Sequence, residues 1–413
     1  MNEHINRRQL LKVTGAAAAA TATGATFAPQ SYARQDAEVT ITWWDYFSDA
    51  NGAAMDAQFA RYMEANPNVT IERTYIAFAD LKQRLLQGAA AGDLPDVVVI
   101  DNPDHQAFSS LGVFEDVTDR VAEWGQAENF FEGPWFSTTF QDRNYGIPDN
   151  SNCLVLWYNT ALFEEAGLEP PTTWEELTAA AEALTEGDRF GLAVSGVKSE
   201  EGTFQWLPFL WATGEDIGTI DSEGGRRALQ LWVDMVENGT MSQGILGWDQ
   251  QDVRTQFQNG RAAMMSNGPW QIPVLAEEAP DLEWNVVTLP EDQQGASILG
   301  GENTAIVKGS ENVDAAWDLL TWRQEPEELR TYLTDAGKLP SRSDLAEDWS
   351  DDPVVSVFVE QLKVAKARAY GDQYPEISAA IQEAIQSAVG GQTDVESAVA
   401  KAQQVITPLL PEG

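Results

Sequence analysis

Val39-Thr40-Ile41-Thr42-Trp43-Trp44 and Val97-Val98-Val99-Ile100 are the two stretches that decide the fold of this chain. The first alternates along its length and is rich in residues that favour β structure, so it predicts a strand. The second is a continuous apolar run, which is typical of a parallel strand buried on both faces. Three further elements are predicted between them: a helix over 53–65, a strand over 69–73, and a helix with Leu81, Leu85 and Leu86 on one face. This βαβαβ order predicts a doubly wound α/β lobe.

A second α/β series follows the first along the chain. Its predicted strands cover 154–158, 190–194 and 262–265, and its predicted helices cover 173–184, 229–236, 252–259, 313–320 and 377–389. The helix over 173–184 begins with Thr173-Trp174-Glu175-Glu176, which fits a capping box. No repeat and no flexible linker divides the two series, so we expect the chain to cross between two lobes several times.

The charge of the chain is strongly acidic. Of its 413 residues, 65 are Asp or Glu and 25 are Lys or Arg, which gives a net charge of −40. This balance argues against a nucleic-acid binder, which needs a basic surface, and against a polybasic membrane-binding surface. The acids are spread along the chain and predict a solvated surface that repels itself at low salt and is screened at high salt. We therefore hypothesise that the source lives in high salt.

The first 33 residues have the pattern of an export signal. Arg7-Arg8-Gln9-Leu10-Leu11-Lys12 resembles the twin-arginine motif, and a run of small apolar residues follows over 13–28. Ser31-Tyr32-Ala33 predicts cleavage after Ala33. A general secretory signal with two chance arginines is the alternative. No cysteine lies near the cleavage site to carry a lipid, and no later apolar run reaches 18 residues, so we expect a soluble product in the periplasm or outside the cell.

Catalytic and metal-binding patterns are scarce in the sequence. His105 is the only histidine beyond the signal, and Cys153 is the only cysteine, so no intramolecular disulfide can form. No G-x-S-x-G, Walker A, G-x-G-x-x-G or calcium-loop pattern occurs. We therefore expect no catalytic residue, no metal and no cofactor. A pair of acids in a cleft could still serve a secreted polysaccharide-active enzyme, and this alternative stays open.

Tryptophan is abundant, and several of the 15 Trp residues lie beside turn residues where predicted strands end. They occur in Trp43-Trp44-Asp45-Tyr46, Gly247-Trp248-Asp249 and Gly268-Pro269-Trp270. In doubly wound sheets, ligands bind outside the carboxyl ends of the strands. Indole rings stack on the apolar faces of pyranose rings, while Asp, Asn and Glu bind the hydroxyls. This combination predicts a sugar-binding cleft, and the alternative for each Trp is packing in the core or between the lobes.

Ten short motifs follow one another over about 39–405. They include Gly92-Asp93-Leu94-Pro95-Asp96-Val97-Val98, Tyr145-Gly146-Ile147-Pro148, Pro171-Thr172-Thr173-Trp174-Glu175-Glu176-Leu177, Gly260-Arg261-Ala262-Ala263-Met264 leading to Gly268-Pro269-Trp270, and Gly337-Lys338-Leu339-Pro340-Ser341-Arg342. Together they resemble the extracellular solute-binding proteins of ABC importers, specifically the carbohydrate-binding family that includes maltose-binding protein.

The resemblance implies two doubly wound α/β lobes, joined by a hinge that the chain crosses several times. We expect the signal at 1–33, the first lobe at 34–146 with about 296–345, and the second lobe at 147–295 with about 346–413. Ligand should favour the closed arrangement of the lobes, because only then do both lobes contact it.

The resemblance and the aromatic pattern also indicate which residues bind ligand. The expected ligand-binding residues are Trp44, Asp45, Tyr46, Asp101, Asn102, Asp104, Asn150, Asn152, Phe204, Trp206, Trp248, Trp270, Glu302, Arg342 and Tyr374. Of these, Trp270 is the expected stacking residue of the second lobe. The motifs near the C-terminus match less clearly around Tyr370 and Tyr374, which leaves the length of the ligand open.

The function that the resemblance implies is capture without chemistry. A monomeric receptor would bind a sugar or oligosaccharide and deliver it to the membrane permease of an ABC importer, which works with a cytoplasmic ATPase. A polyamine, a sugar phosphate or a compatible solute on the same fold is the alternative. An anionic ligand would need an arginine, for which Arg342 is the obvious candidate, and a cationic ligand would suit Asp45, Asp101 and Glu302.

Overall fold

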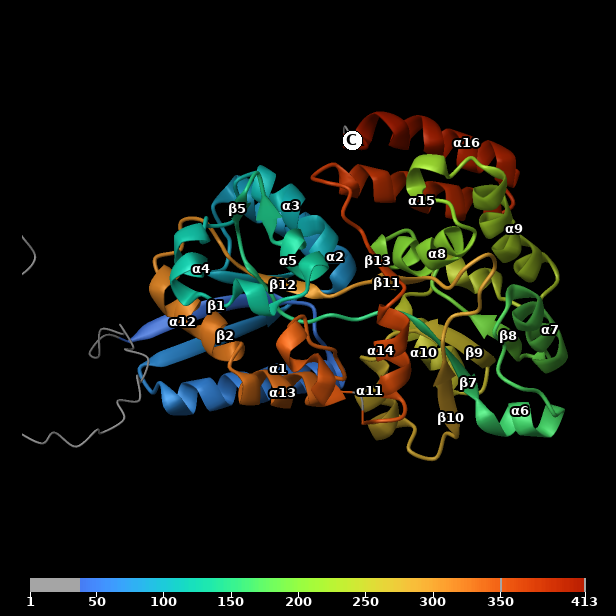
Figure 1. The fold of residues 1–413 in the computed structure, drawn as a ribbon, viewed down its shortest axis with the longest axis horizontal. Helices are drawn as coiled ribbons and strands as arrows, with labels where there is room; N and C mark the ends of the chain where they lie inside the picture. Colours follow the sequence, from blue (N-terminus) through green and yellow to red (C-terminus); the bar gives the residue numbers. More distant parts are fainter. Residues whose placement is uncertain (1–37, 350, 412–413) are drawn as a thin grey trace, which may run out of the picture. The chain divides into compact units, whose positions relative to one another are not determined.

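The computed structural model describes residues 38–349 and 351–411. The predicted signal and its cleavage site lie outside the described residues. Two main sheets organise the described part of the chain (Figure 1). The chain is therefore an α/β protein, as the sequence predicts.

The first sheet has five strands in the order β2 (Val69–Tyr75), β1 (Val39–Asp45), β3 (Val97–Asp101), β12 (Glu302–Ile306) and β6 (Ile147–Pro148). Strand β1 runs parallel to β2 and β3, as the βαβαβ pattern predicts. Strand β12 runs antiparallel to both β3 and β6. The chain thus leaves this sheet after β6 and returns to its interior much later, at β12.

Alternate residues of these strands supply two separate cores, because successive side chains of a strand point to opposite faces. Ile41, Trp43 and Val99 pack on one side with α1 (Asp49–Ala65), α12 (Val313–Arg323) and α13 (Pro326–Asp335). Trp44, Val98 and Ile100 pack on the other side with α2 (Phe78–Ala91) and α3 (Asn102–Ser110). Helices therefore cover both faces of the sheet (Figure 1).

The second sheet has four strands in the order β10 (Trp284–Val287), β7 (Val155–Asn159), β9 (Ala262–Asn267) and β8 (Phe190–Ala193). Strands β8 and β9 are parallel, and β7 is antiparallel to its neighbours β9 and β10. Leu156 and Met264 face α7 (Trp174–Leu184), α8 (Glu200–Ala212) and α9 (Glu223–Glu237). Trp157 and Met265 face α10 (Gln250–Gln258), α11 (Gln271–Glu278) and α14 (Val355–Leu362).

The C-terminal helices α15 (Tyr374–Val389) and α16 (Val395–Ile406) pack on each other and on α9, and α15 also packs on α8 (Figure 1). A small parallel sheet joins β11 (Ser297–Leu299) to β13 (Ala365–Ala367). The remaining short elements are α4 (Thr118–Trp124), α5 (Glu132–Ser137), α6 (Thr160–Ala166), β4 (Thr139–Phe140), β5 (Arg143–Asn144) and the 3-10 turns at Ala127–Asn129, Ile217–Thr219, Gln243–Leu246, Ser343–Trp349 and Thr407–Leu409.

Two local expectations need correction. Leu81 and Leu85 are buried, but Leu86 is 47% exposed, because the apolar face of α2 is narrower than the three leucines predict.

The capping box of α7 forms only in part. Thr173 accepts a hydrogen bond from the Glu176 N–H, as predicted, but the Glu176 carboxylate accepts from the N–H and hydroxyl of Thr172 instead of returning to Thr173.

Candidate ligand-binding site

A cavity of about 760 Å³, open mouth included, lies where the two main sheets present the ends of their strands. Tyr46 and Ser48 follow β1, and Asp101 ends β3. Because β12 runs antiparallel to β3, its first residue, Glu302, lies directly opposite Asp101. From the other side, α8 contributes its first turn, and Trp270 precedes α11 after the end of β9. This is the place that strand order predicts for a ligand in an α/β protein.

Phe204 and Trp270 form an aromatic wall of the cavity. Their ring centroids are 6.4 Å apart, and the rings are tilted by 49°. Two glycines leave room for this wall. A Cβ at Gly268 would lie 1.9 Å from the Trp270 ring, and a Cβ at Gly300 would lie 2.1 Å from Asn152 Oδ1 and 2.8 Å from the Phe204 ring. Any larger residue at these positions would displace the wall, so the sequence uses glycine for close approach.

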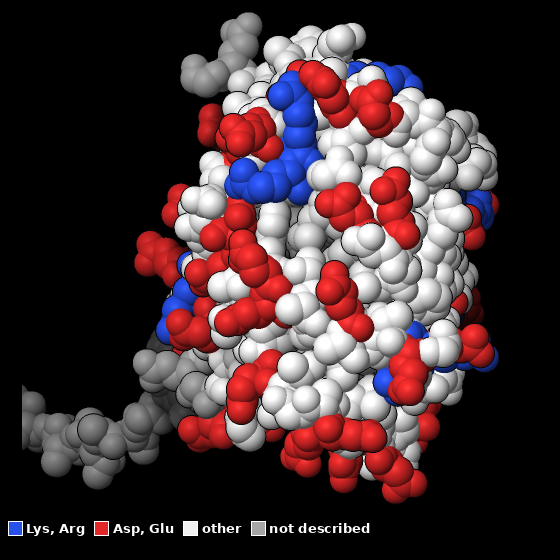
Figure 2. All heavy atoms as spheres, turned by 90° about the vertical axis from the view of Figure 1, so that its right-hand side faces the viewer, with Lys and Arg blue, Asp and Glu red and all other residues white. Residues whose placement is uncertain are grey.

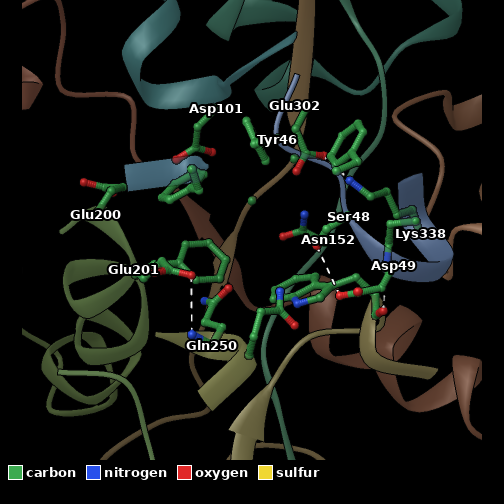
Figure 3. A pocket seen from close by; sticks show the side chains of 18 of the residues that line it. Tyr46, Ser48, Asp49, Asp101, Asn152, Glu200, Glu201, Gln250, Glu302 and Lys338 are labelled. Carbon is green, nitrogen blue, oxygen red and sulfur yellow. Dashed lines mark hydrogen bonds and ion pairs between the residues drawn. The ribbon is translucent and has the colours of Figure 1, made fainter. Parts of the chain in front are cut away.

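Carboxylates dominate the polar lining. Asp49, Asp101, Glu200, Glu201 and Glu302 all line the cavity, and Figure 3 shows them distributed around it. One cation, Lys338, pairs with Glu302 at 2.8 Å and lies 3.8 Å from the centroid of the Phe47 ring. The other cation of the lining, Arg368, pairs with Asp101 and Glu200.

Arg368 is held by a dense network of charged hydrogen bonds. Its Nη1 and Nη2 atoms donate to the two oxygens of Asp101 at 2.9 and 3.0 Å, and Nη1 donates to Glu200 Oε1 at 2.6 Å. Tyr374 donates to the same Glu200 oxygen at 2.7 Å. Burial, opposed by Arg368, raises the pKa of Asp101 to about 7, and the Glu200 carboxylate adds to this rise. The network joins the end of β3 to the beginning of α8.

Several hydrogen-bond acceptors of the lining remain available to a ligand. Asn51 Oδ1 and Asn152 Oδ1 are buried without a hydrogen-bond partner among the described residues. The Glu201 carboxylate accepts one long hydrogen bond, of 3.4 Å, from the Gln250 N–H. Burial raises the pKa of Glu201 to about 8, and the carboxylate of Asp249 contributes to the rise. These groups suit a ligand rich in hydroxyl or amine donors.

Six of the residues predicted to bind ligand line this cavity: Tyr46, Asp101, Asn152, Phe204, Trp270 and Glu302. They come from six separate segments of the chain, and the fold brings them together. The sequence predicts aromatic side chains beside acids and an amide, and the cavity contains this combination.

Nine predicted residues do not line the cavity, and most are held by other contacts. Trp206 is buried in the core, and Trp248 is half-buried and packs beside both large core clusters. Three of the remaining seven form ion pairs: Asp45 with Arg73, Asp104 with Lys82, and Arg342 with Asp344. Three form hydrogen bonds: Asn102 accepts from Arg368, Asn150 donates to Asp149, and Tyr374 donates to Glu200. The last, Trp44, is buried, and the Arg84 guanidinium lies over its ring. Asp45 shows one cause of such a miss. Successive side chains point to opposite faces, so Asp45 points away from the face that its neighbour Tyr46 occupies.

Sequence reasoning missed Glu200, Glu201, Lys338 and Arg368. The sequence proposes Arg342 as the candidate cleft arginine, whereas Arg368 occupies that position. A local signal for the two glutamates exists, because Ser199 caps α8 by accepting from the Glu201 N–H and so marks the helix start. Arg368 follows a short strand of three residues and has no such signal.

Comparisons with known proteins agree with this architecture. The family model described as bacterial extracellular solute-binding protein matches residues 57–356, and the twin-arginine translocation signal model matches residues 4–24. A lactose-binding protein of Rhizobium radiobacter is 26% identical over 328 residues, which cover 74% of this chain and 75% of that protein. No described helix has the length and apolar character needed to cross a membrane.

Two solved structures superpose over most of the chain. The solute-binding protein of an ABC transporter from Thermotoga lettingae, bound with α-D-tagatose, has a TM-score of 0.85 and 27% identity, and the match covers 90% of this chain and 100% of that one. The maltose-bound protein MalE3 of T. maritima has a TM-score of 0.83 and 25% identity, with the same coverage.

Proposed function

Since this chain belongs to the bacterial extracellular solute-binding protein family, we propose that it captures a sugar or short oligosaccharide in the cavity beside Trp270 and delivers it to the permease of an ABC importer. It is an exported receptor and not an enzyme, as its family and its twin-arginine signal indicate. The aromatic wall of Phe204 and Trp270, faced by unpartnered acceptors, is the observation that carries the sugar assignment. Stacking on the wall would hold a sugar ring while Asn152 and the acids accept from its hydroxyls.

The two sheets support a further proposal about the lobes. Strands β1, β2, β3 and β6, all before residue 149, build one sheet together with β12, and strands between 155 and 287 build the other. This division supports lobes close to 34–146 with about 296–345, and 147–295 with about 346–413. Ligand would close the lobes because residues near both sheets line the cavity.

A cationic solute is the second candidate. Asp49 and Glu201 favour it, because both line the cavity and neither takes part in the ion pairs found among the described residues. A phosphate ester is disfavoured, since Lys338 and Arg368 are already paired with carboxylates.

The experiment that separates these candidates is a titration of the mature protein at high salt, followed by tryptophan fluorescence and calorimetry. We expect a saturable response to one sugar class, with the sugar recovered unchanged. A response to polyamines alone, weakening as salt increases, would replace the sugar assignment with a cationic one. A sugar recovered in cleaved form would overturn the receptor assignment.

We also propose that the protein works in high salt. Figure 2 shows acidic side chains spread over the face that it presents, without concentration in one patch. Together with the net charge of −40, this distribution supports a surface that needs screening.

A further inference from the structure

A second cavity lies directly behind Arg368. Its volume is about 300 Å³ with the open mouth included, and it is lined by residues of α3, α5 and the end of β13 with the two residues that follow, among them Asn102, Gln106 and Phe136. Arg368 lines both this cavity and the larger one. Its partners divide in the same way, because Asp101 and Glu200 line the larger cavity and Asn102 lines the second. The Arg368 side chain is therefore the partition between two spaces.

The partition is rigid. Arg368 is only 4% exposed, and its guanidinium makes four hydrogen bonds, of 2.6 to 3.1 Å, to Asp101, Asn102 and Glu200. Its guanidinium carbon also lies 4.7 Å from the centroid of the Phe204 ring, at the aromatic wall. A bidentate arginine clamped in this way is far less free to swing aside than an exposed cation.

The partition stands at one end of the larger cavity. Figure 3 shows Asp101 and Glu200, which hold Arg368, on the side away from Ser48, Asp49 and Lys338. A sugar ring on the Phe204–Trp270 wall could therefore extend toward Asp49, but it would meet the guanidinium in the other direction. Arg368 Nε is buried without a hydrogen-bond partner among the described residues, so one donor of the guanidinium is left unsatisfied.

The second cavity has features that would suit another sugar ring. Phe136 is 49% exposed on its rim, and an exposed aromatic face can stack on a sugar. Gln106 is fixed by hydrogen bonds from its Nε2 to the carbonyl oxygens of Phe136, at 3.2 Å, and Thr139, at 2.8 Å. The space is thus preformed but closed off from the aromatic wall.

We propose that Arg368 limits the length of the sugar that this receptor accepts, and that its removal joins the two cavities and admits longer chains. This inference rests on the proposed sugar-binding function. Arg368 would then determine which sugar lengths the receptor accepts, in addition to stabilising the contact between β3 and α8.

The test compares affinities within a series of mono-, di-, tri- and tetrasaccharides of one hexose, measured by calorimetry on the wild type and on Arg368→Ala. The readout is the ratio of trisaccharide to monosaccharide affinity, so a general weakening of binding cancels. We expect the wild type to favour the short sugars and Arg368→Ala to raise the ratio about tenfold, as one added aromatic contact would. Lys366→Ala is the matched control, because Lys366 lies two residues away, pairs with Asp216 and lines neither cavity.

A second pair of variants protects the test against misfolding, because Arg368→Ala leaves Asp101 and Glu200 buried without their shared cation, and Asp101 is the carboxylate that both guanidinium nitrogens bind. Arg368→Ala combined with Asp101→Asn removes that charge, and Asp101→Asn alone is its reference. Phe136→Ala should leave the wild-type ratio unchanged but should cancel the gain in an Arg368→Ala background. An unchanged ratio in folded Arg368 variants, or a wild type that binds tetrasaccharides as tightly as monosaccharides, would overturn the inference. A wild type that binds no sugar at all would instead overturn the proposed function.

Discussion

At the scale of single residues, Trp270 is the side chain on which the sugar proposal depends most. It is half-buried, lies beside Phe204, and has its ring accommodated by the missing side chain of Gly268. We predict that Trp270→Ala weakens sugar binding by about 1–3 kcal/mol, the range for losing a large apolar contact. Calorimetry with the best sugar of the panel measures this. Trp317→Ala, which removes a tryptophan packed on Trp124, is the control and should keep the affinity.

Glu201 predicts a dependence of stability on pH. Its pKa rises from an ordinary 4.5 in the unfolded chain to about 8 in the fold, mainly through burial. The folded state therefore binds the extra proton between these values. The contribution of Glu201 is fully present below about pH 4.5 and is lost as pH rises through about 8.

Urea unfolding of the wild type and of Glu201→Gln, repeated from pH 5 to pH 9, measures this effect. The unfolding free energy should fall less steeply with pH in Glu201→Gln than in the wild type. At pH 9 the variant should therefore be more stable than the wild type. Glu237→Gln, at the exposed end of α9, is the control and should follow the wild type. Parallel curves for wild type and Glu201→Gln would mean that Glu201 does not carry the dependence.

Single residues of the site were also harder to predict from the sequence than the fold. Tyr46 and Trp270 could be found because they follow a recognisable strand or lie in a turn, and Glu302 because it follows Gly300-Gly301, a motif of the family resemblance. Arg368 could not, because its role depends on Asp101 and Glu200, which are 267 and 168 positions away along the chain. Long-range ion pairs leave no periodic pattern in a sequence.

At the scale of elements, the start of α7 offers a simple test of local energetics. The Thr173 hydroxyl accepts from the Glu176 N–H at 3.2 Å, which satisfies one free donor of the first turn. Thr173→Ala should lower the free energy of unfolding by about 1 kcal/mol and leave sugar affinity unchanged. Denaturant unfolding checks this. Thr178→Ala in the same helix is the matched control, since alanine is favourable inside a helix; an equal loss there would contradict the capping argument.

The main strands were predicted well and the short elements poorly. Strands β1 and β3 carry clear alternation or continuous apolar runs, and the sheet buries them as the pattern requires. Strand β12 was missed because three of its five residues, Glu302, Asn303 and Thr304, are polar although every residue is buried. Its polar side chains serve the cavity and the interior hydrogen bonds, so they hide the apolar signal of a central strand.

At the scale of the whole molecule, we expect charge to govern how stability responds to salt. The net charge is −40, and acidic side chains are spread over the face that Figure 2 presents, so we expect self-repulsion to act once screening weakens. Lowering salt from about 1 M to about 0.1 M lengthens the screening distance from about 3 Å to about 10 Å. We predict that the melting temperature falls over this range and that the protein unfolds at the lowest salt, as circular dichroism would show. A melting temperature indifferent to salt would remove the high-salt proposal.

Strand β12 has a final consequence for synthesis. It lies between β3 and β6, yet it is made only after residue 301, long after both neighbours. Until then β3 has no partner on that side, and an open strand edge invites pairing with other chains. The first sheet therefore cannot be completed while the ribosome is still making the second, and one edge of β3 stays open while the chain from residue 102 to residue 301, about half of the protein, is made. An export route that waits for a finished fold, as the twin-arginine route does, suits a protein whose first sheet is completed so late.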